Sequence, residues 1–349
     1  MNKSLRIVSS PQDLKEGLFG QVFLFVFEVL PYLDEAGIMP DWAIRSKLYG
    51  TAERDFVVIP GLLELNYNPE IPKSGFRNVS LKKLRKQRTV ALGNDWNYIS
   101  ELWAKYFRIP DRITERADKF PTLDGALGLH YRGTDKNKSS VETNLVSEVE
   151  FMKLVGDFVG SHPEIRVIFI ASDESSFVER VRKTYPDREI LSSGDVVHHK
   201  DTGHHDNFAK GDHAVLDCVL LSRCRYLLKC QSALSGFAKV LNPGIEAYRI
   251  SANKLARWNR EIPYFPDGYL PKYQGISPGN IEILERLFAG DWTENRAVSE
   301  KFGNVFRYVN RDCGSEQQRV PLEIVGRVFG CVRRAMGQCG NPLKRMRPK

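Results

Sequence analysis

The sequence predicts an α/β protein whose central part is a parallel, doubly wound sheet. From residue 125 onward, short runs of β-branched and aromatic residues alternate with longer segments of helical periodicity. The short runs are almost wholly apolar, which is typical of strands that are buried on both faces. Regular strand–helix alternation provides the crossover connections that parallel strands require.

The elements of this sheet follow one another without a break. The predicted strands cover residues 125–132, 166–173, 188–193, 225–230 and 246–250. The predicted helices between them cover residues 146–163, 175–186, 211–224 and 232–244. Each helical segment has apolar residues three and four positions apart, so each presents one apolar face to the sheet.

The flanking regions have a weaker pattern. Before the sheet, the sequence predicts a helix within 17–37, a strand at 55–60, a helix at 98–109 and a loop-like segment at 110–125. Beyond residue 262 it predicts helices that begin at Pro278 and Pro321. We therefore expect an N-terminal domain at 1–120, a parallel-sheet domain at 121–262 and a mostly helical extension at 263–349.

A polar stretch follows the first strand of the sheet. His130 ends the apolar run, and Arg132, Gly133, Asp135 and Lys136 come directly after it. The carboxyl ends of parallel strands carry the ligand sites in open α/β sheets. A guanidinium matches two phosphate oxygens and stays charged, so Arg132 is the candidate to bind a pyrophosphate. Asp135 is expected to orient Arg132 or to bond a sugar hydroxyl; the alternative is a surface Arg–Asp pair that caps a loop.

Two later stretches place more polar side chains near the same edge. The second strand ends on Asp173, and the third helix carries Asp217 among apolar residues. A carboxylate in such surroundings needs a partner, and the N1–H and N2–H edge of guanine offers two parallel donors. Ser232 and Ser235 begin the next helix, where free amides favour phosphate. The alternatives are Asp217 as a local backbone cap and Ser232 as an ordinary N-cap.

Three stretches of the chain resemble the successive motifs of one known family. They are GLHYRGTDK (128–136), VIFIASDE (167–174) and LDCVLLSRCRYLLKCQSALSGFAKVLNP (216–243). Their order and spacing are similar to those of the α-1,6-fucosyltransferase and protein O-fucosyltransferase superfamily, which includes rhizobial nodulation fucosyltransferases. The resemblance implies a GT-B fold, with two Rossmann-like domains facing across a cleft. Residues 1–120 would form the acceptor-side domain and residues 121–262 the nucleotide-sugar-binding domain. It also implies metal-independent transfer from GDP-β-L-fucose with inversion.

The resemblance implies a role for several single residues. Arg132 would hold the β-phosphate, while His130 and Asp217 would contact the guanosine. Further contacts to the donor would come from Asp173, Ser232 and Ser235, and the GLFGQ stretch with Gly17 and Gly20 resembles the N-terminal glycine loop of the family.

The residues that catalyse transfer are expected just after the first motif. Gly133 stands where the family pattern His-x-Arg-Arg-x-Asp has its second arginine, and Lys136 would partly replace that cation. Inverting transfer needs a base opposite the leaving diphosphate, and Glu142 is our candidate because relatives place a glutamate shortly after the motif. With Arg132 and Asp135 these residues form the expected catalytic set. A loose, oxocarbenium-like path, in which base strength matters little, is the alternative.

Charge and missing motifs limit the other functions. Lys and Arg number 51 against 43 Asp and Glu, a net charge of +8, which favours anionic partners. The basic residues are scattered, so no nucleic-acid partner is expected. The sequence has no Walker loop, no Gly-x-Gly-x-x-Gly and no Asp-x-Asp, so we expect no cofactor or metal beside the GDP-sugar donor.

Two other activities remain possible at this stage. The same fold could use another donor such as GDP-L-galactose. Five histidines crowd into residues 198–213, which suggests a metal-dependent phosphohydrolase as a further alternative. We expect a loop over the nucleotide there instead, because no histidine pair has a helical four-residue spacing on a confident helix.

The expected location is cytoplasmic, since no secretory signal or membrane span is apparent and Cys218, Cys224 and Cys230 fall in a hydrophobic stretch, as buried thiols do. The acceptor is then expected to be a glycan, a lipid-linked oligosaccharide or a polysaccharide. The basic tail LKRMRPK suggests peripheral contact with the inner membrane face; a disordered solubilising end is the alternative.

Overall fold

The structure is a computed structural model of the chain. It describes residues 5–9, 17–22, 29–69, 77–81, 83, 96–133, 147–194, 207–230 and 232–249. The chain divides into two compact units, Met1–Asp312 and Cys313–Lys349, and every described residue belongs to the first. The predicted extension at 263–349 lies outside the described residues.

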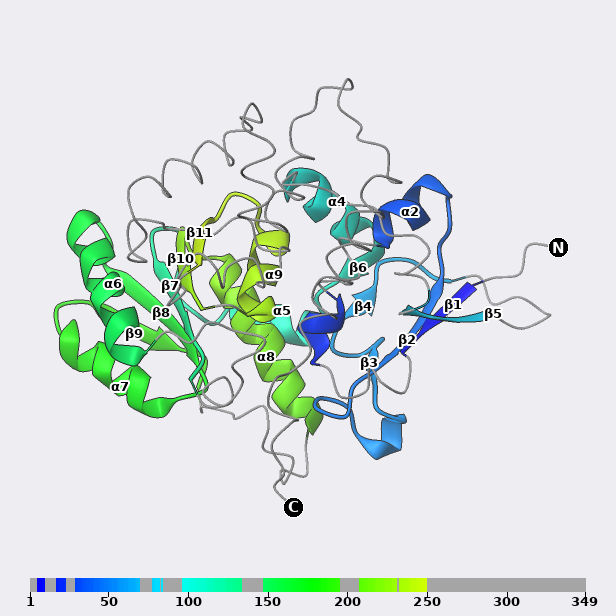
Figure 1. The fold of residues 1–349 in the computed structure, drawn as a ribbon, viewed down its shortest axis with the longest axis horizontal. Coiled ribbons are helices and arrows are strands. Elements are labelled where there is room, and N and C mark those ends of the chain that lie inside the picture. The colour runs from blue at the N-terminus through cyan, green and yellow to red at the C-terminus, as the bar shows by residue number, and fades with distance from the viewer. Residues whose placement is uncertain are drawn as a thin grey trace, which may run out of the picture. The chain divides into compact units, whose positions relative to one another are not determined.

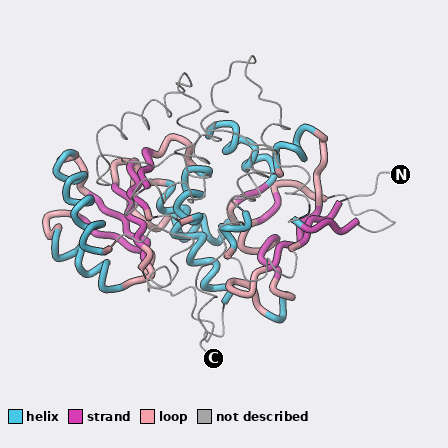
Figure 2. The backbone as a smooth tube through the Cα atoms, viewed as in Figure 1, coloured by secondary structure: helices cyan, strands magenta, loops and turns pink. Residues whose placement is uncertain are grey.

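The larger sheet contains the five strands that the sequence predicts. They are β7 (Leu127–Tyr131), β8 (Val167–Ser172), β9 (Glu189–Ser192), β10 (Tyr226–Lys229) and β11 (Glu246–Arg249). All neighbouring pairs are parallel and the strand order is β11-β10-β7-β8-β9, so the prediction of a parallel sheet is confirmed. Figure 2 shows the strands of the described part in magenta and the helices in cyan. This is the order of the doubly wound nucleotide-binding fold.

Four helices connect these strands: α6 (Glu148–Ser161), α7 (Ser175–Thr184), α8 (Asn207–Ser222) and α9 (Ala233–Leu241). Helices α6 and α7 cover one face of the sheet, and α8 and α9 lie on the other (Figure 1). Alternate residues serve the two faces: Leu127 and Leu129 pack toward α6 and α7, whereas Gly128 faces α8. A Cβ at Gly128 would lie 3.1 Å from Leu221 of α8, so the glycine permits that helix to pack closely.

The N-terminal part contains a smaller mixed sheet. Its strands are β1 (Leu5–Val8), β2 (Asp41–Arg45), β3 (Val57–Ile59) and β5 (Arg77–Ser80), in the order β3-β2-β1-β5. Strand β1 is parallel to β2 and β5, and β3 is antiparallel to β2. Strands β4 (Glu64–Leu65) and β6 (Phe107–Arg108) form a separate antiparallel pair.

Helices of the N-terminal part correct two of the predictions. The predicted helix at 17–37 comprises a helical turn at 18–22 and a second helix, α2 (Leu30–Glu35), with residues 23–28 outside the described part. The 3-10 helix η2 (Ala52–Arg54) was not predicted. The predicted helix at 98–109 ends earlier, since α4 (Trp96–Tyr106) is followed by β6.

The segment predicted as loop-like, 110–125, contains a helix, α5 (Asp111–Ala117). Pro110 lies at its N-cap, where its fixed backbone angle suits a helix start. Ile113 and Ala117, four positions apart, form its buried face. The prediction was wrong because two apolar positions in seven residues are too few to show a helical period.

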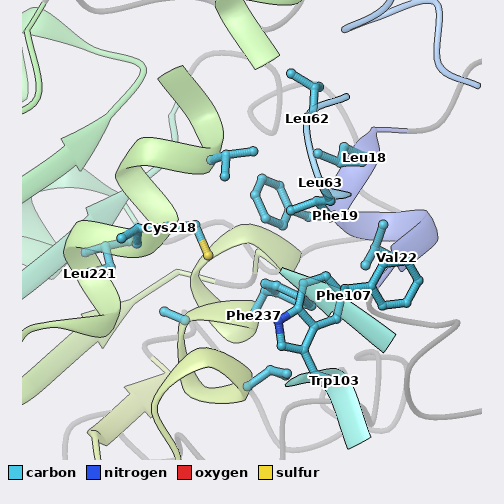
Figure 3. Packing of buried hydrophobic residues seen from close by; sticks show 14 of the residues in the cluster. Leu18, Phe19, Val22, Leu62, Leu63, Trp103, Phe107, Cys218, Leu221 and Phe237 are labelled. Carbon is cyan, nitrogen blue, oxygen red and sulfur yellow. The ribbon is translucent and has the colours of Figure 1, made fainter. Parts of the chain in front are cut away.

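An aromatic cluster joins four of these segments (Figure 3). Trp103 of α4 stacks on Phe107 of β6 at 4.7 Å between ring centroids and meets Phe237 of α9 edge-on, also at 4.7 Å. Phe19 contacts the same Phe237 ring at 5.7 Å. Residues separated by most of the described chain therefore share one apolar core.

A polar contact adds to this core. Arg112 of α5 donates two hydrogen bonds to Asp212 of α8, at 3.0 and 2.6 Å, and one to the Gly61 carbonyl at 2.8 Å. The geometry is the two-point pairing that a guanidinium makes with a carboxylate.

In the part of the chain that the structure describes, no helix is both long and apolar enough to cross a membrane.

Candidate functional site

The strand order of the larger sheet reverses between β7 and β10. The chain passes from β7 to β8 and β9 on one side and then continues with β10 and β11 on the other side. Ligands of open α/β sheets bind outside the carboxyl ends of the strands at such a point. The register pairs His130 of β7 with Lys229 of β10, so both residues lie at this position on the same face.

His130 is buried and bonded at this point. Its Nδ1 lies 2.7 Å from the Ser235 Oγ, and its backbone carbonyl accepts from the Cys230 amide at 2.9 Å. The Cys230 Sγ is 3.9 Å from the same ring nitrogen. Burial, with smaller effects of the nearby Arg132 and Lys229 charges, lowers the pKa of His130 to about 3. The imidazole is therefore neutral at working pH and acts by hydrogen bonding, not by charge.

Lys229 is a residue of this site that the sequence reasoning did not select. Its side chain is fully buried at the last position of β10. A lysine at the end of a wholly apolar strand is uncommon, because the ammonium loses hydration there. The single charge in YLLK, residues 226–229, was the available signal. Its charge is one of the causes that lower the pKa of His130, after burial and the charge of Arg132.

Ser232 and Ser235 lie beside these two residues, at the start of α9. Ser232 is the N-cap residue of α9 and is buried, but its hydroxyl makes no capping hydrogen bond. Ser235 is fully buried between His130 and the Ser232 carbonyl, to which its hydroxyl donates at 3.4 Å. A helix start with two hydroxyls next to a buried cation suits an anionic ligand.

Arg132 and Gly133 continue the chain from β7. Arg132 is partly buried, and its charge is felt by the His130 ring. The Gly133 amide donates to Asp173 Oδ1 at 3.1 Å, which ties the ends of β7 and β8 together. A Cβ at Gly133 would lie only 2.1 Å from Oε1 of Glu174. The space beside Gly133 is therefore occupied by a carboxylate, at the position where the family pattern has an arginine.

Asp217 belongs to a second cluster. Its Oδ1 accepts a short hydrogen bond from the Ser193 hydroxyl, and the same hydroxyl lies 2.8 Å from Nε2 of His213. Burial raises the pKa of Asp217, while the His213 and Arg116 charges and the Ser193 hydrogen bond act in the opposite direction. Asp217, the residue predicted to contact the guanosine, is thus joined to Ser193 and His213. The sequence analysis did not connect these two residues with Asp217.

Two of the remaining predicted site residues lie near the N-terminus, and the others lie outside the described part of the chain. Gly17 precedes the helical turn at 18–22 and Gly20 lies inside it, so the GLFGQ stretch is helical where a glycine loop was expected. Asp135, Lys136, Glu142 and the histidines at 198–205 lie outside the described residues. Among the residues with described positions, no group of three His, Cys, Asp or Glu could hold a metal ion.

The fold and the site together define an α/β protein with a doubly wound parallel sheet. A parallel sheet with reversed strand order has cationic and hydroxyl side chains at its switch point.

Residues 109–234 match the family model described as the N- and catalytic domains of alpha-(1,6)-fucosyltransferase. The match is a little over a third of the chain and contains β7, β8, β9, β10 and α8. This part of the chain is therefore related to the alpha-(1,6)-fucosyltransferases, which are glycosyltransferase enzymes. The relationship predicted from the three sequence motifs is confirmed.

Several solved structures are similar to the chain. The crystal structure of fucosyltransferase NodZ from Bradyrhizobium has 14% identity and a TM-score of 0.42, over 69% of this chain and 95% of NodZ. NodZ alpha-1,6-fucosyltransferase soaked with GDP-fucose has 14% identity and a TM-score of 0.41, over 69% and 94%. POFUT1 in complex with GDP-fucose has 13% identity and a TM-score of 0.33, over 68% and 69%. A comparison with curated protein sequences finds no match.

Proposed function

We propose that the protein transfers L-fucose from GDP-β-L-fucose to a glycan or glycoconjugate acceptor, with inversion and without a metal ion. The observation that carries the proposal is the position of the fucosyltransferase match. Residues 109–234 include the ends of β7 and β10, where Arg132 and buried Lys229 lie at the switch point of the sheet.

The chemistry of the departing group supports this choice. When the bond between fucose C1 and the phosphate oxygen breaks, GDP leaves with an additional negative charge. Fixed donors that face this charge lower the barrier. Arg132 supplies a guanidinium, Ser232 supplies a hydroxyl at a helix start, and Lys229 adds a buried positive charge. Ser235 contributes by holding His130 in place.

The neutral His130 takes a different part in the proposal. With its pKa near 3 it cannot pair with phosphate as a cation. Its Nδ1 is engaged with Ser235, so Nε2 is the ring nitrogen that would bond the nucleoside. Arg132 is then the residue assigned to the β-phosphate, and His130 the residue assigned to the guanosine.

Inversion requires the acceptor hydroxyl to attack C1 from the face opposite GDP. Its oxygen forms the new bond to C1, and its proton passes to a base, for which Glu142 stays our candidate. Asp135 and Lys136 complete the catalytic set that we propose. The GT-B arrangement, the domains at 1–120, 121–262 and 263–349, and a cytoplasmic site of action with a lipid-linked or polysaccharide acceptor belong to the same proposal.

Calorimetric titration with GDP tests the donor site directly. We expect micromolar binding in EDTA that added magnesium does not strengthen, and a loss of about 30-fold or more in Arg132→Ala, because charge-assisted bonds to phosphate are removed. Arg182→Ala is the matched control, since Arg182 is exposed on α7 and pairs with Glu179. Transfer from radiolabelled GDP-fucose, compared with GDP-L-galactose, then identifies the sugar. A wild-type chain that binds no GDP, or full turnover in Arg132→Ala, contradicts the proposal.

A further inference from the structure

Ser193 bridges two titratable side chains of α8. Ser193 comes directly after β9, and its hydroxyl contacts both Nε2 of His213, at 2.8 Å, and Oδ1 of Asp217. His213 and Asp217 are four positions apart, so their side chains lie one above the other on the same face of the helix. Gly194 adjoins this group, with an added Cβ 3.8 Å from the His213 ring.

When Asp217 is ionised, the hydrogen bonds among Ser193, His213 and Asp217 can be donated in one direction only. An ionised carboxylate only accepts, so the Ser193 hydroxyl donates its proton to Asp217. The Ser193 oxygen then accepts from His213, which requires the proton of the imidazole on Nε2. The chain of donors then runs from His213 through Ser193 to Asp217, and the bond to Ser193 holds the carboxylate in one orientation.

We propose that Ser193 and His213 are positioning residues that hold Asp217 ready to recognise a guanine base. This rests on the proposed function, in which GDP is the nucleotide of the donor. A carboxylate has about four acceptor positions, so the bond to Ser193 leaves enough of them for two parallel donors. The N1–H and N2–H groups of guanine are such a pair.

Recognition of guanine requires an ionised Asp217, and Ser193 and His213 favour this form. Burial raises the pKa of this carboxyl, and a protonated Asp217 would present an O–H toward the N1–H of guanine. In the described residues, the titratable groups whose charges interact with Asp217 are His213 on the same helix, Arg116 of α5 and the next residue, Cys218. The His213 charge and the Ser193 hydrogen bond both favour the ionised form, and so does Arg116.

The arrangement predicts a definite order of nucleotide preference. Inosine diphosphate lacks the N2 amino group and loses one of the two hydrogen bonds. Adenosine diphosphate presents the N1 acceptor in place of the N1–H donor, so an ionised Asp217 repels it. GDP should therefore bind more tightly than IDP, and IDP more tightly than ADP, by roughly tenfold for each step.

Titrations of the full chain with GDP, IDP and ADP test the role of Ser193. Ser193→Ala should weaken GDP binding by about tenfold and reduce the ratio of GDP to IDP affinity. Ser193→Thr keeps the hydroxyl and should restore both. His213→Gln, with an Nε2–H that still donates, should stay closer to wild type than His213→Phe. Ser161→Ala is the control, because Ser161 is exposed and bonds only its own helix backbone.

The pH dependence provides a second measurement. Loss of the Ser193 hydrogen bond raises the pKa of Asp217 further, so GDP binding in Ser193→Ala should begin to fail at a higher pH as the solution is acidified. A purely structural effect of Ser193→Ala would weaken the binding of GDP, IDP and ADP equally. It would also leave unchanged the pH at which GDP binding is lost on acidification.

The outcomes separate the two proposals. If wild type binds no GDP, the proposed function is wrong. If wild type binds GDP and Asp217→Asn loses it, but Ser193→Ala keeps the wild-type nucleotide order and pH profile, only the positioning role is wrong. Thermal unfolding of each variant shows whether it folds. If Ser193→Ala fails to fold, Ser193→Thr tests the positioning role instead. A folded Ser193→Thr variant that does not restore the preference for GDP over IDP contradicts that role.

Discussion

The Nδ1 atom of His130 and the Oγ atom of Ser235 lie 2.7 Å apart and join the end of β7 to the first turn of α9, across 105 residues of sequence. Both side chains are buried. This bond lies at the point where the strand order of the sheet reverses, so it fixes the start of α9 against the edge at which we place the diphosphate.

Ser235→Ala should destabilise the protein by about 1–3 kcal/mol, because a buried ring nitrogen loses its partner. Urea unfolding measures the change. Ser161→Ala, an exposed serine on α6, should change the unfolding free energy by less than about 0.5 kcal/mol. Equal effects of the two substitutions would show that the bond to His130 contributes nothing to stability.

His130 should make the stability depend on pH. Its pKa in the folded protein is about 3, below the ordinary value near 6.5, so the unfolded chain binds a proton that the folded chain does not. The unfolding free energy should therefore fall by about 1.4 kcal/mol per pH unit as pH drops from about 6.5 toward 3.

His130→Gln removes this contribution, and the difference between variant and wild type across pH isolates it. Asp217 acts with the opposite sign, because its raised pKa lets the folded chain hold a proton that the unfolded chain releases. Because both proteins contain Asp217, its contribution to the unfolding free energy drops out of the difference at each pH. A difference between wild type and His130→Gln that stays constant from pH 8 to pH 4.5 would contradict the low pKa.

Lys229→Met should raise the pKa of His130, because the lysine charge is one of the causes that lower it. Burial, the largest cause, remains, so the value should stay below 6.5. Histidine NMR signals followed against pH report this shift, with Lys183→Met on the exposed end of α7 as control. An unchanged His130 titration in Lys229→Met would show that the lysine charge does not reach the ring.

Gly133→Ala should cost about 1 kcal/mol, because the new Cβ would lie 2.1 Å from the carboxylate of Glu174, which must move. In a Glu174→Ala background the same change should be neutral or slightly stabilising, since alanine restricts the unfolded chain. A double-mutant cycle by urea unfolding measures the coupling.

Gly125→Ala is the control for this cycle, because no atom lies within 4 Å of the position that its added methyl group would take and its backbone angle is ordinary. It should show no coupling to Glu174. Additive effects at Gly133 and Glu174 would mean that the two residues do not compete for the same space.

The larger sheet could be predicted because its signal is local. Each strand from β7 to β11 is a short apolar run between amphipathic helices. The smaller sheet was harder to predict, since β2 is half-buried and its sequence DWAIR has charges at both ends. Asp41 of β2 pairs with Arg6 of β1, so these charges are satisfied by a neighbouring strand that the local sequence does not identify.

The positions of the candidate site residues could be predicted in part. Arg132 and His130 lie at the end of a predicted strand, and Ser232 and Ser235 lie at the start of a predicted helix. Lys229 was missed because one lysine in an apolar run does not reveal on which edge it will lie. The contact of Ser193 with His213 and Asp217 depends on the packing of α8 beside the end of β9.

The sequence by itself determined the strands and helices of the parallel sheet, because apolar periodicity is a property of neighbouring residues. It also determined the residue types at the strand ends and the relationship to the fucosyltransferases. Only the tertiary structure decided which of these residues meet. Strand order and helix packing bring together groups about 20 to 105 residues apart, and the burial that results sets the protonation of His130 and Asp217.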